Sequence, residues 1–470
     1  MKQHHQKTLK TISFPNQTIN DLLEIIGKKM TKQYISAIDI GTSKITALIG
    51  EIKEDQIQLI GLGEAPSTGL DAGLIINIDQ TTEAIQTALS NAERIADCKI
   101  LSISTGISGN HIRCLNVHGE VNIRDGEVSQ SDVDRSKEIA LAISLLPENQ
   151  ILHTVVQEYS IDGVDCIRHP IGINGARLDT KIHIITGQSN AERNIRRCVD
   201  PCHLDINEIK VQALASADAI LTEDEKKLGV CVLDIGCGTT DIAVYFNDAI
   251  RHTAVLPLGG HQITRDIHRA LITTYQAAED IKIRYGSVLP EAVPHDNMIE
   301  VPSLGEQAPR QIAHFQLATV IEARVQELFN IVCNELEHAQ ITPEMLSAGI
   351  VITGGTSLLH GICQLAQKTF DELPVRVGIP KRMVGMNDQI RDPRYASAVG
   401  LLLSAQKYAQ QNGISAGREN MPKTQTYHET VLTKETSPDN PQQIILPRQK
   451  PEGIIKHYVK KFFNFTEEHL

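Results

Sequence analysis

The sequence has no paired arrangement of cysteines and no long apolar run, and both absences limit what the chain can be. Its nine cysteines are an odd number without the spacing of a zinc site, so we expect buried or free thiols in a reducing cytosol. No stretch approaches the run of about eighteen apolar residues that a membrane-spanning helix needs. A formal net charge of -12 argues against a nucleic-acid-binding body.

The composition is that of a folded protein of more than one domain. The chain has 470 residues, of which 41% are apolar and 22% are charged, so wholesale disorder is excluded. Residues 1–29 are polar and basic and lack the continuous apolar core of a secretory signal. We expect this leader to be either a disordered extension or the result of a start codon chosen upstream of a working start at Met30.

The chain is organised around residues 230–246, VCVLDIGCGTTDIAVYF. Two apolar runs flank Asp-Ile-Gly and a glycine-rich turn, which predicts a β-hairpin. Gly236 and Gly238 are expected to take positive φ angles and to present backbone N–H groups to a phosphate. Asp234 would repel that phosphate, so a Mg²⁺ ion held through water is expected between them. An ordinary hairpin with a surface aspartate explains this stretch alone equally well.

A second copy of the pattern favours the phosphate site. Residues 36–51, SAIDIGTSKITALIGE, repeat the apolar strand, Asp-Ile-Gly, polar turn and apolar strand. Two such hairpins facing each other could hold one polyphosphate from both sides. Residues 349–359, GIVITGGTSLL, place a third glycine turn after a buried-type strand, where backbone can lie against a flat ligand such as adenosine.

The three turns, in this order, resemble the two phosphate motifs and the adenosine motif of the actin, Hsp70 and sugar-kinase superfamily. Within it the chain is most similar to the bacterial cell-division FtsA family, over residues 34–405 and the extreme C-terminus. The strings that carry the resemblance are DIGCGTTDIAVY, LTEDEKKLGV before it, AIRHT after it, and EDIKIRYG at 279–286.

The resemblance implies an actin-like ATPase fold of class α/β. It has two duplicated RNase H-like lobes, an inserted small subdomain, a flexible linker and a C-terminal amphipathic helix. The expected boundaries are a leader at 1–29, the first part of the first lobe at 30–96, the inserted interaction subdomain at 97–176, the rest of the first lobe at 177–230, the second lobe with its adenosine motif and closing helix at 231–405, a disordered linker at 406–451, and a membrane-targeting helix at 452–470.

The resemblance also implies a binding site for ATP with Mg²⁺. Asp39 and Asp234 are expected on the metal side, through water. The residues assigned to the cofactor are Asp39, Gly41, Thr42, Ser43, Lys44, Asp234, Gly236, Gly238, Thr239, Thr240, Gly259, Gly260, Glu279, Lys282, Gly354, Gly355 and Thr356.

Three of the site assignments have simpler alternatives. Gln212 stands at a strand-to-helix junction where actin-like proteins place a glutamine that orients the attacking water, but a capping or surface glutamine is slightly favoured. Glu279 and Lys282 are three residues apart, so an ordinary helical salt bridge competes evenly with a nucleoside contact. We therefore expect ATP binding with at most weak hydrolysis.

The remaining regions carry the expected contacts with partners. By resemblance, the inserted subdomain contacts the next molecule of a head-to-tail polymer and other division proteins, although a purely structural insertion is equally open. Residues 408–451 are polar and interrupted by proline, as in a disordered tether. Residues 453–465, GIIKHYVKKFFNF, follow, with apolar side chains at helical spacing and lysines beside them. The expected membrane contacts are Ile454, Ile455, Tyr458, Val459, Phe462 and Phe463, with Lys456, Lys460 and Lys461 toward anionic phospholipid.

The function implied is an actin-like ATP-binding protein of cell division. It would anchor filaments of the tubulin-like protein FtsZ to the cytoplasmic face of the inner membrane at the septum, as a peripheral protein, and recruit later division proteins. A PilM-like pilus-assembly protein is the nearest alternative, but the tethered amphipathic tail argues against it. A sugar kinase would need a substrate cleft with a catalytic carboxylate, and an Hsp70-like chaperone would need a peptide-binding domain after residue 405. If the tail docks on the chain's own body, the membrane assignment fails.

Overall fold

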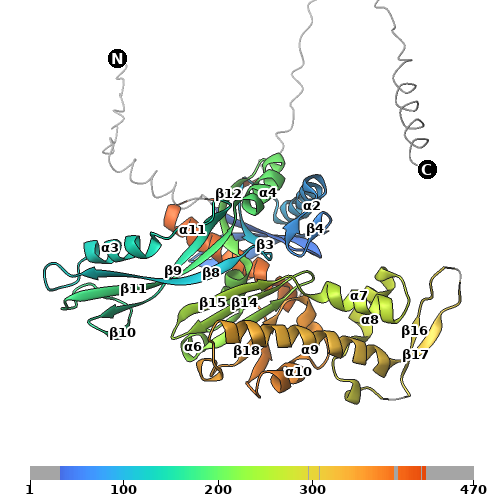
Figure 1. Cartoon of the computed structure of the whole chain (residues 1–470). Coiled ribbons are helices and arrows are strands. Elements are labelled where there is room, and N and C mark those ends of the chain that lie inside the picture. Colours follow the sequence, from blue (N-terminus) through green and yellow to red (C-terminus); the bar gives the residue numbers. More distant parts are fainter. Residues whose placement is uncertain (1–31, 295, 306, 386–389, 414, 420–470) are drawn as a thin grey trace, which may run out of the picture. The chain divides into compact units, whose positions relative to one another are not determined.

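The computed structural model describes residues 32–419 except 295, 306, 386–389 and 414 (Figure 1). The leader at 1–29, most of the predicted linker and the predicted membrane helix with its nine named residues lie outside the described part. Within the described part, no helix combines the length and the apolar character needed to cross a bilayer.

The first lobe is built on a five-stranded sheet in the order β12-β7-β1-β2-β3. Its strands are β1 (Gln33–Ile40), β2 (Lys44–Lys53), β3 (Gln56–Pro66), β7 (Ser102–Ile107) and β12 (Asp205–Val211). The first three form an antiparallel meander. β7 runs parallel to β1, and β12 runs parallel to β7.

The second lobe repeats this topology. Its sheet has the order β15-β14-β13-β18-β19. The strands are β13 (Val230–Ile235), β14 (Thr240–Phe246), β15 (Ala249–Leu256), β18 (Ile350–Thr353) and β19 (Val375–Val377). Again a meander of three strands is followed by two parallel strands. The predicted duplication of the lobes is confirmed by the identical strand orders and directions.

Two helices pack between the sheets, α5 (Gln212–Ile220) and α11 (Ala396–Asn412). A Cβ atom on Gly400 would lie 1.8 Å from the carbonyl oxygen of Ala215, so the two helices cross closely only because this position is glycine. Successive side chains of β13 point to opposite faces of the sheet. Val230 and Val232 belong to the core that contains α5 and α11, whereas Cys231 and Leu233 belong to the core on the opposite face.

The inserted subdomain has its own antiparallel sheet, in the order β10-β9-β11-β8. It consists of β8 (Arg113–Asn122), α3 (Gln130–Leu141), β9 (Asn149–Ile161), β10 (Val164–Ile167) and β11 (Arg177–Gln188). The predicted boundaries of 97 and 176 are therefore wrong at both ends. β7 hydrogen-bonds to β1 of the first lobe, while β11 lies between β8 and β9 of the insertion.

The other helices cover the sheets or join them. They are α2 (Ile78–Ala96), α4 (Ser189–Val199), α6 (Glu223–Leu228), α7 (Gly260–Ala270), α8 (Tyr275–Tyr285), α9 (His314–His338) and α10 (Ile362–Thr369), with 3-10 turns at Asp200–Cys202, Pro290–Ala292, Pro343–Met345, Gly355–Leu358 and Pro393–Tyr395. The short strands are β4 (Leu70–Asp71), β5 (Leu74–Ile75), β6 (Cys98–Ile100), β16 (Met298–Val301), β17 (Arg310–Ala313) and β20 (Gly417–Glu419). Helix α9 lies along the second sheet, and its apolar residues share a core with the outward face of β13 (Figure 1).

The C-terminal edge of the folded body lies further along the chain than predicted. Helix α11 continues to Asn412, and β20 then pairs with β6. The N–H of Ala416 donates to the carbonyl of Tyr34 at 2.7 Å, and the N–H of Leu101 donates to the carbonyl of Ala416 at 2.7 Å. A linker that begins at 406 is thus wrong, because a buried alanine at 416 still ties the chain to the first lobe.

Candidate functional site

The first hairpin turn joins β1 to β2 through residues 41–43. Ile40 pairs with Ile45 across the turn. A Cβ on Gly41 would lie 2.8 Å from the carbonyl oxygen of Lys44, so the turn closes this tightly only with glycine. Asp39, one residue before the end of β1, accepts a hydrogen bond of 2.7 Å from Nε2 of Gln212.

The second hairpin turn joins β13 to β14, and its tip touches the first lobe. The N–H of Gly236 donates to the carbonyl of Thr239 at 2.9 Å. A Cβ on Gly238 would lie 2.8 Å from Oγ1 of Thr42 and 3.0 Å from Cα of Ala72. The predicted positive φ angles at Gly236 and Gly238 are wrong, since neither residue is among those with positive φ. Close approach of the two turns, rather than backbone strain, explains the glycine at 238.

Three carboxylates gather at the bases of these turns. Burial raises the pKa of Asp39 to about 7, and the charge of Asp234 adds to the effect, outweighing Lys44 and the hydrogen bond from Gln212. Burial and the charge of Asp234 likewise raise the pKa of Asp241 to about 7, and burial raises the pKa of Asp234. Such mutual repulsion would be relieved by a nearby cation.

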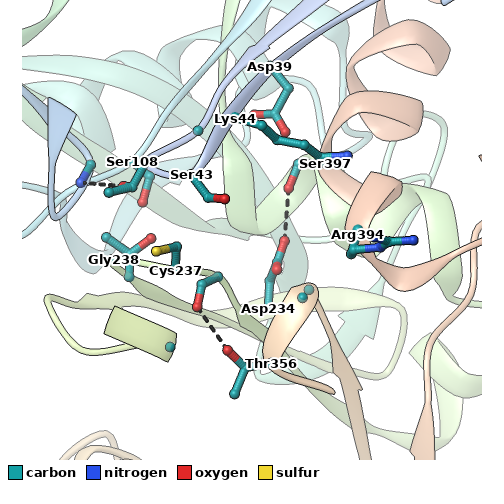
Figure 2. A pocket seen from close by; sticks show the side chains of 18 of the residues that line it. Asp39, Ser43, Lys44, Ser108, Asp234, Cys237, Gly238, Thr356, Arg394 and Ser397 are labelled. Carbon is teal, nitrogen blue, oxygen red and sulfur yellow. Dashed lines mark hydrogen bonds between the residues drawn. The ribbon is translucent and has the colours of Figure 1, made fainter. Parts of the chain in front are cut away.

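Hydroxyl groups from four different segments fix the two carboxylates of the second lobe. Ser397 of α11 donates to Oδ2 of Asp234 at 2.8 Å (Figure 2). Ser216 of α5 donates to the same oxygen. Asp241 accepts from Ser108 at 2.6 Å and from Thr239 at 3.0 Å. The carboxylates therefore have defined orientations even though they are largely buried.

The third turn, after β18, closes against the second hairpin. Gly354 has a φ of 83°, in the left-handed region that favours glycine. A Cβ there would lie 2.5 Å from both Oδ1 of Asp234 and the carbonyl oxygen of Ile235. Oγ1 of Thr356 donates to the carbonyl of Gly236 at 3.1 Å, which joins the third turn to the second (Figure 2).

The three turns surround one cavity of about 460 Å³, which falls in the range of small-molecule sites. Most of the predicted cofactor residues line it: Asp39, Gly41, Thr42, Ser43, Lys44, Asp234, Gly236, Gly238, Thr239, Gly260, Glu279, Lys282, Gly354, Gly355 and Thr356. Their contacts with a nucleotide stay a prediction.

Thr240 and Gly259 are not brought to the cavity. Thr240 is fully buried and donates its hydroxyl to the carbonyl of Leu258 at 2.8 Å. A Cβ on Gly259 would lie 2.7 Å from the carbonyl oxygen of Gly236, so this glycine packs directly against the backbone of the second turn. Both residues support the wall of the cavity, and their assignment to direct ligand contact is not supported.

The predicted cationic groups already have partners within the chain. The ammonium of Lys44 pairs with Glu64 and lies 3.7 Å from the centre of the Tyr395 ring. Lys282 pairs with Glu279 at 2.8 Å and also donates to the carbonyl of Gly260 at 3.1 Å. The two interpretations of the Glu279–Lys282 pair are therefore compatible, because the salt bridge is formed and both residues line the cavity.

Gln212 does not cap its helix. The first residue of α5 is Gln212, and no side chain makes a cap hydrogen bond there. Its amide instead reaches Asp39 and lines the cavity, which removes the capping alternative. A Cβ on Gly106 would lie 2.8 Å from Cγ of Gln212, so the neighbouring strand leaves room for this side chain only through glycine. Its role toward water stays a prediction.

Several lining residues are absent from the sequence-based assignment. Ser108, Asp241, Arg394, Tyr395 and Ser397 all line the cavity. Asp241 stands within the DIGCGTTD string, opposite Asp234 in the hairpin register, and that pairing was the available signal. The other four come from segments whose sequence indicates only a strand end or a packed helix.

The residues present fit a nucleotide with a divalent cation. The cavity offers backbone of two turns, a flat glycine turn and carboxylates whose pKa values are raised by burial and mutual charge. Within the described residues no three histidine, cysteine or acidic side chains cluster as direct metal ligands. The nine cysteines all lie in the described part and are free thiols, as predicted.

Comparison with known families identifies the chain. A family model described as cell division protein FtsA matches residues 231–400, and one described as the SHS2 domain inserted in FTSA matches residues 109–186. The PilM-PilN type IV pilus biogenesis complex aligns with a TM-score of 0.57 at 18% identity, over 79% of this chain and 98% of that chain. That likeness concerns the fold, which is the actin-like ATPase fold with an inserted subdomain.

The sequence relatives are much more similar. The chain is 52% identical over 377 residues to cell division protein FtsA of Neisseria meningitidis serogroup B, covering 80% of this chain and 91% of the relative. It is 40% identical over 382 residues to cell division protein FtsA of Escherichia coli K12, again covering 80% and 91%. The chain belongs to the FtsA family of bacterial cell-division proteins.

Proposed function

We propose that this chain binds ATP with Mg²⁺ between its lobes and attaches FtsZ filaments to the cytoplasmic face of the inner membrane at the septum, where it recruits later division proteins. The observation that carries the proposal is the pair of facing hairpin turns with Asp39 and Asp234 at their bases, lining one cavity. Family membership supports the division role.

Each part of the cavity suits one part of the nucleotide. The N–H groups of the turns at 41–43 and 236–239 supply donors for phosphate oxygens. Asp39 and Asp234 would hold the water ligands of Mg²⁺, and the cation would neutralise the negative charge of the phosphates. Gly354 and Gly355 would lie against the adenosine, beside the Glu279–Lys282 pair.

Hydrolysis is proposed to be weak. Gln212 is the residue placed to orient water, but its Nε2 donates to Asp39 at 2.7 Å. An amide held by a carboxylate has one of its donors already used, and a glutamine has no group that can accept a proton as a general base. Binding, rather than turnover, would then be the working property of the site.

The membrane role rests on the sequence of the tail together with the family. Ile454, Tyr458 and Phe462 recur every four residues, and the three lysines at 456, 460 and 461 accompany them. Such a helix would lie in the plane of an anionic leaflet. Each lysine near that surface contributes about 1 kcal/mol, so attachment would be reversible and sensitive to salt.

Isothermal titration of ATP tests the nucleotide site. Asp234→Ala should abolish the Mg²⁺-dependent part of the affinity and leave the fold intact. Asp280→Ala is the matched control, because Asp280 is an exposed carboxylate of α8 outside the cavity. Equal affinities of the parent and Asp234→Ala, with and without Mg²⁺, would remove Asp234 from the site.

A further inference from the structure

A cysteine, a histidine and a glutamate from three separate elements form a hydrogen-bonded chain outside the nucleotide cavity. Sγ of Cys114, on β8 of the inserted subdomain, lies 3.5 Å from Nδ1 of His252, on β15 of the second lobe. Nε2 of His252 lies 3.0 Å from Oε1 of Glu335, on α9. A nucleophile next to a base that a third group orients is the arrangement of activated cysteines.

The surroundings hold this group in place at the boundary between the subdomain and the second lobe. Nδ2 of Asn116 donates to the carbonyl of Arg251 at 3.0 Å. His183 bridges Oδ1 of Asn116 at 2.7 Å and Oγ1 of Thr253 at 3.0 Å. The residues of β15 that these bonds reach, Arg251 and Thr253, are the two neighbours of His252 in the chain. A separation of β8 from β15 would therefore break these hydrogen bonds.

The electrostatics favour an ion pair between the thiol and the imidazole. Burial alone would raise the pKa of Cys114, but the hydrogen bond and charge of His252, with hydrogen bonds to Thr253, lower it below its usual value. Burial would lower the pKa of His252, but Cys114 and Glu335 outweigh that effect and raise it. His183 also faces His252, and burial and the charge of His252 lower its pKa to about 4, so it stays neutral.

The pKa of Cys114 is lowered overall, although burial is the largest single effect on it, because the contacts with His252 and Thr253 together outweigh burial. In seven other thiols burial is also the largest effect, but there the pKa is raised: Cys98, Cys198, Cys202, Cys231, Cys237, Cys333 and Cys363. Cys114 is only partly buried, and the side chains of His252 and Glu335 are 13% and 32% exposed, so this group is not sealed inside the core.

We propose that Cys114 is a nucleophilic thiolate and a site of oxidation by hydroperoxides, with His252 as its proton donor and Glu335 as the residue that positions His252. The sulfur lone pair forms an S–O bond to the peroxide oxygen that carries hydrogen, while the O–O bond breaks. The leaving alkoxide, or hydroxide from hydrogen peroxide, takes the proton of the His252 imidazolium. Sulfur is oxidised by two electrons to a sulfenic acid, and the peroxide is reduced to an alcohol or water.

Peroxide labelling of the full chain tests the proposal. The protein is treated with hydrogen peroxide and dimedone between pH 5.5 and 9, and labelling of each cysteine is followed by peptide mass spectrometry, with N-acetylcysteine as reference thiol. At pH 6.5 a thiol with the ordinary pKa of about 8.5 is only about 1% thiolate. Cys114 should therefore react at least about tenfold faster than the reference at this pH. Cys166, an exposed thiol on β10, controls for access.

Variants separate activation from mere exposure. His252→Gln should slow labelling of Cys114 at least about tenfold at pH 6.5, and the difference from the parent should shrink toward pH 9, where a larger fraction of the thiol is ionised without the imidazole. Glu335→Gln should shift the pH profile of Cys114 in the same direction by a smaller amount. The proposal is overturned if Cys114 reacts no faster than N-acetylcysteine at pH 6.5, or if His252→Gln leaves its pH profile unchanged. If His252→Gln does not fold, the pH profile of Cys114 labelling in the parent protein is the test. A labelling rate that falls continuously as the pH is lowered from 8.5 to 6.5 contradicts the proposal.

Discussion

The hydroxyl of Ser397 donates a 2.8 Å hydrogen bond to the carboxylate of Asp234, although the two residues are 163 positions apart in the chain. Asp234 lies on the face of β13 that Val230 and Val232 turn toward α5 and α11. Ser216 of α5 donates to the same oxygen. Both helices between the lobes thus hold the carboxylate that is proposed to face Mg²⁺.

Removing one of these donors should weaken nucleotide binding. In Ser397→Ala, Asp234 keeps Ser216 as donor but loses the bond from α11, so its orientation toward the cation is less fixed. Loss of one hydrogen bond to a charged group is worth about 1.5–3 kcal/mol, so Mg²⁺–ATP affinity should fall roughly tenfold or more in a calorimetric titration. Ser404→Ala is the matched control, since Ser404 lies on the same helix and donates to Glu208 instead. Equal losses in both variants would mean that the effect comes through α11 as a whole.

The raised pKa of Asp39 makes the stability of the nucleotide-free protein depend on pH. Its pKa is about 7 in the folded chain and 3.8 when unperturbed. Between these values the folded protein keeps a proton that the unfolded chain has released, so the free energy of unfolding falls as pH rises from about 4 to about 7. Asp39→Asn removes the loss of stability that comes from ionising a buried carboxylate.

Melting temperatures at two pH values test that prediction. Asp39→Asn should melt several degrees above the parent at pH 8, since each kcal/mol shifts the melting temperature of a domain of 150–250 residues by about 2–4 °C, and the difference should be much smaller at pH 4.5. Asp280→Asn, an exposed position, controls for the loss of one charge. A difference between Asp39→Asn and the parent that is the same at both pH values would contradict the assignment of the effect to ionisation.

The helix crossing should tolerate no side chain at position 400. In Gly400→Ala the new Cβ would lie 1.8 Å from the carbonyl oxygen of Ala215, so α5 and α11 must move apart. Overpacking of this kind costs about 1–3 kcal/mol, and the midpoint of urea unfolding should fall accordingly. Gly355→Ala is the control, because the nearest atom to its new Cβ is 3.7 Å away. An unchanged urea midpoint for Gly400→Ala would show that α5 and α11 can accommodate a methyl group at this crossing, which would contradict the prediction.

Much of the fold and most of the cavity could be predicted from the sequence, because both hairpins are local patterns. Asp39 and Asp234 each lie one residue before the end of an apolar strand that leads into a glycine turn, and the repeat of this pattern predicts the duplicated lobes. The reason for the glycines was not predictable. Gly238 is needed because a Cβ there would lie 2.8 Å from Oγ1 of Thr42 in the other lobe, a close approach that no local pattern encodes.

The residues missed in the site come from long-range packing. Ser108 reaches Asp241 across 133 positions, and Ser397 reaches Asp234 across 163. A serine in a strand end or a packed helix has no sequence signature that says which carboxylate it meets. The predicted linker boundary at 406 is wrong for a similar reason. The residues around Ala416 are polar and indicate a linker, and the sequence carries no signal for the hydrogen bond from the N–H of Ala416 to the carbonyl of Tyr34.

Liposome flotation with purified FtsZ tests the central claim, that this chain attaches FtsZ filaments to a membrane through its C-terminal segment. Fully burying one phenylalanine is worth about 1.5–3 kcal/mol, so Phe462→Glu should lower the affinity for anionic vesicles by at least about tenfold. Asn464→Glu adds the same charge off the predicted apolar face and serves as the matched control. The account predicts that the parent and Asn464→Glu float and carry FtsZ with them, while Phe462→Glu and FtsZ stay at the bottom with ATP affinity unchanged. If Phe462→Glu floats as well as the parent, or if the parent floats without FtsZ, the account is contradicted.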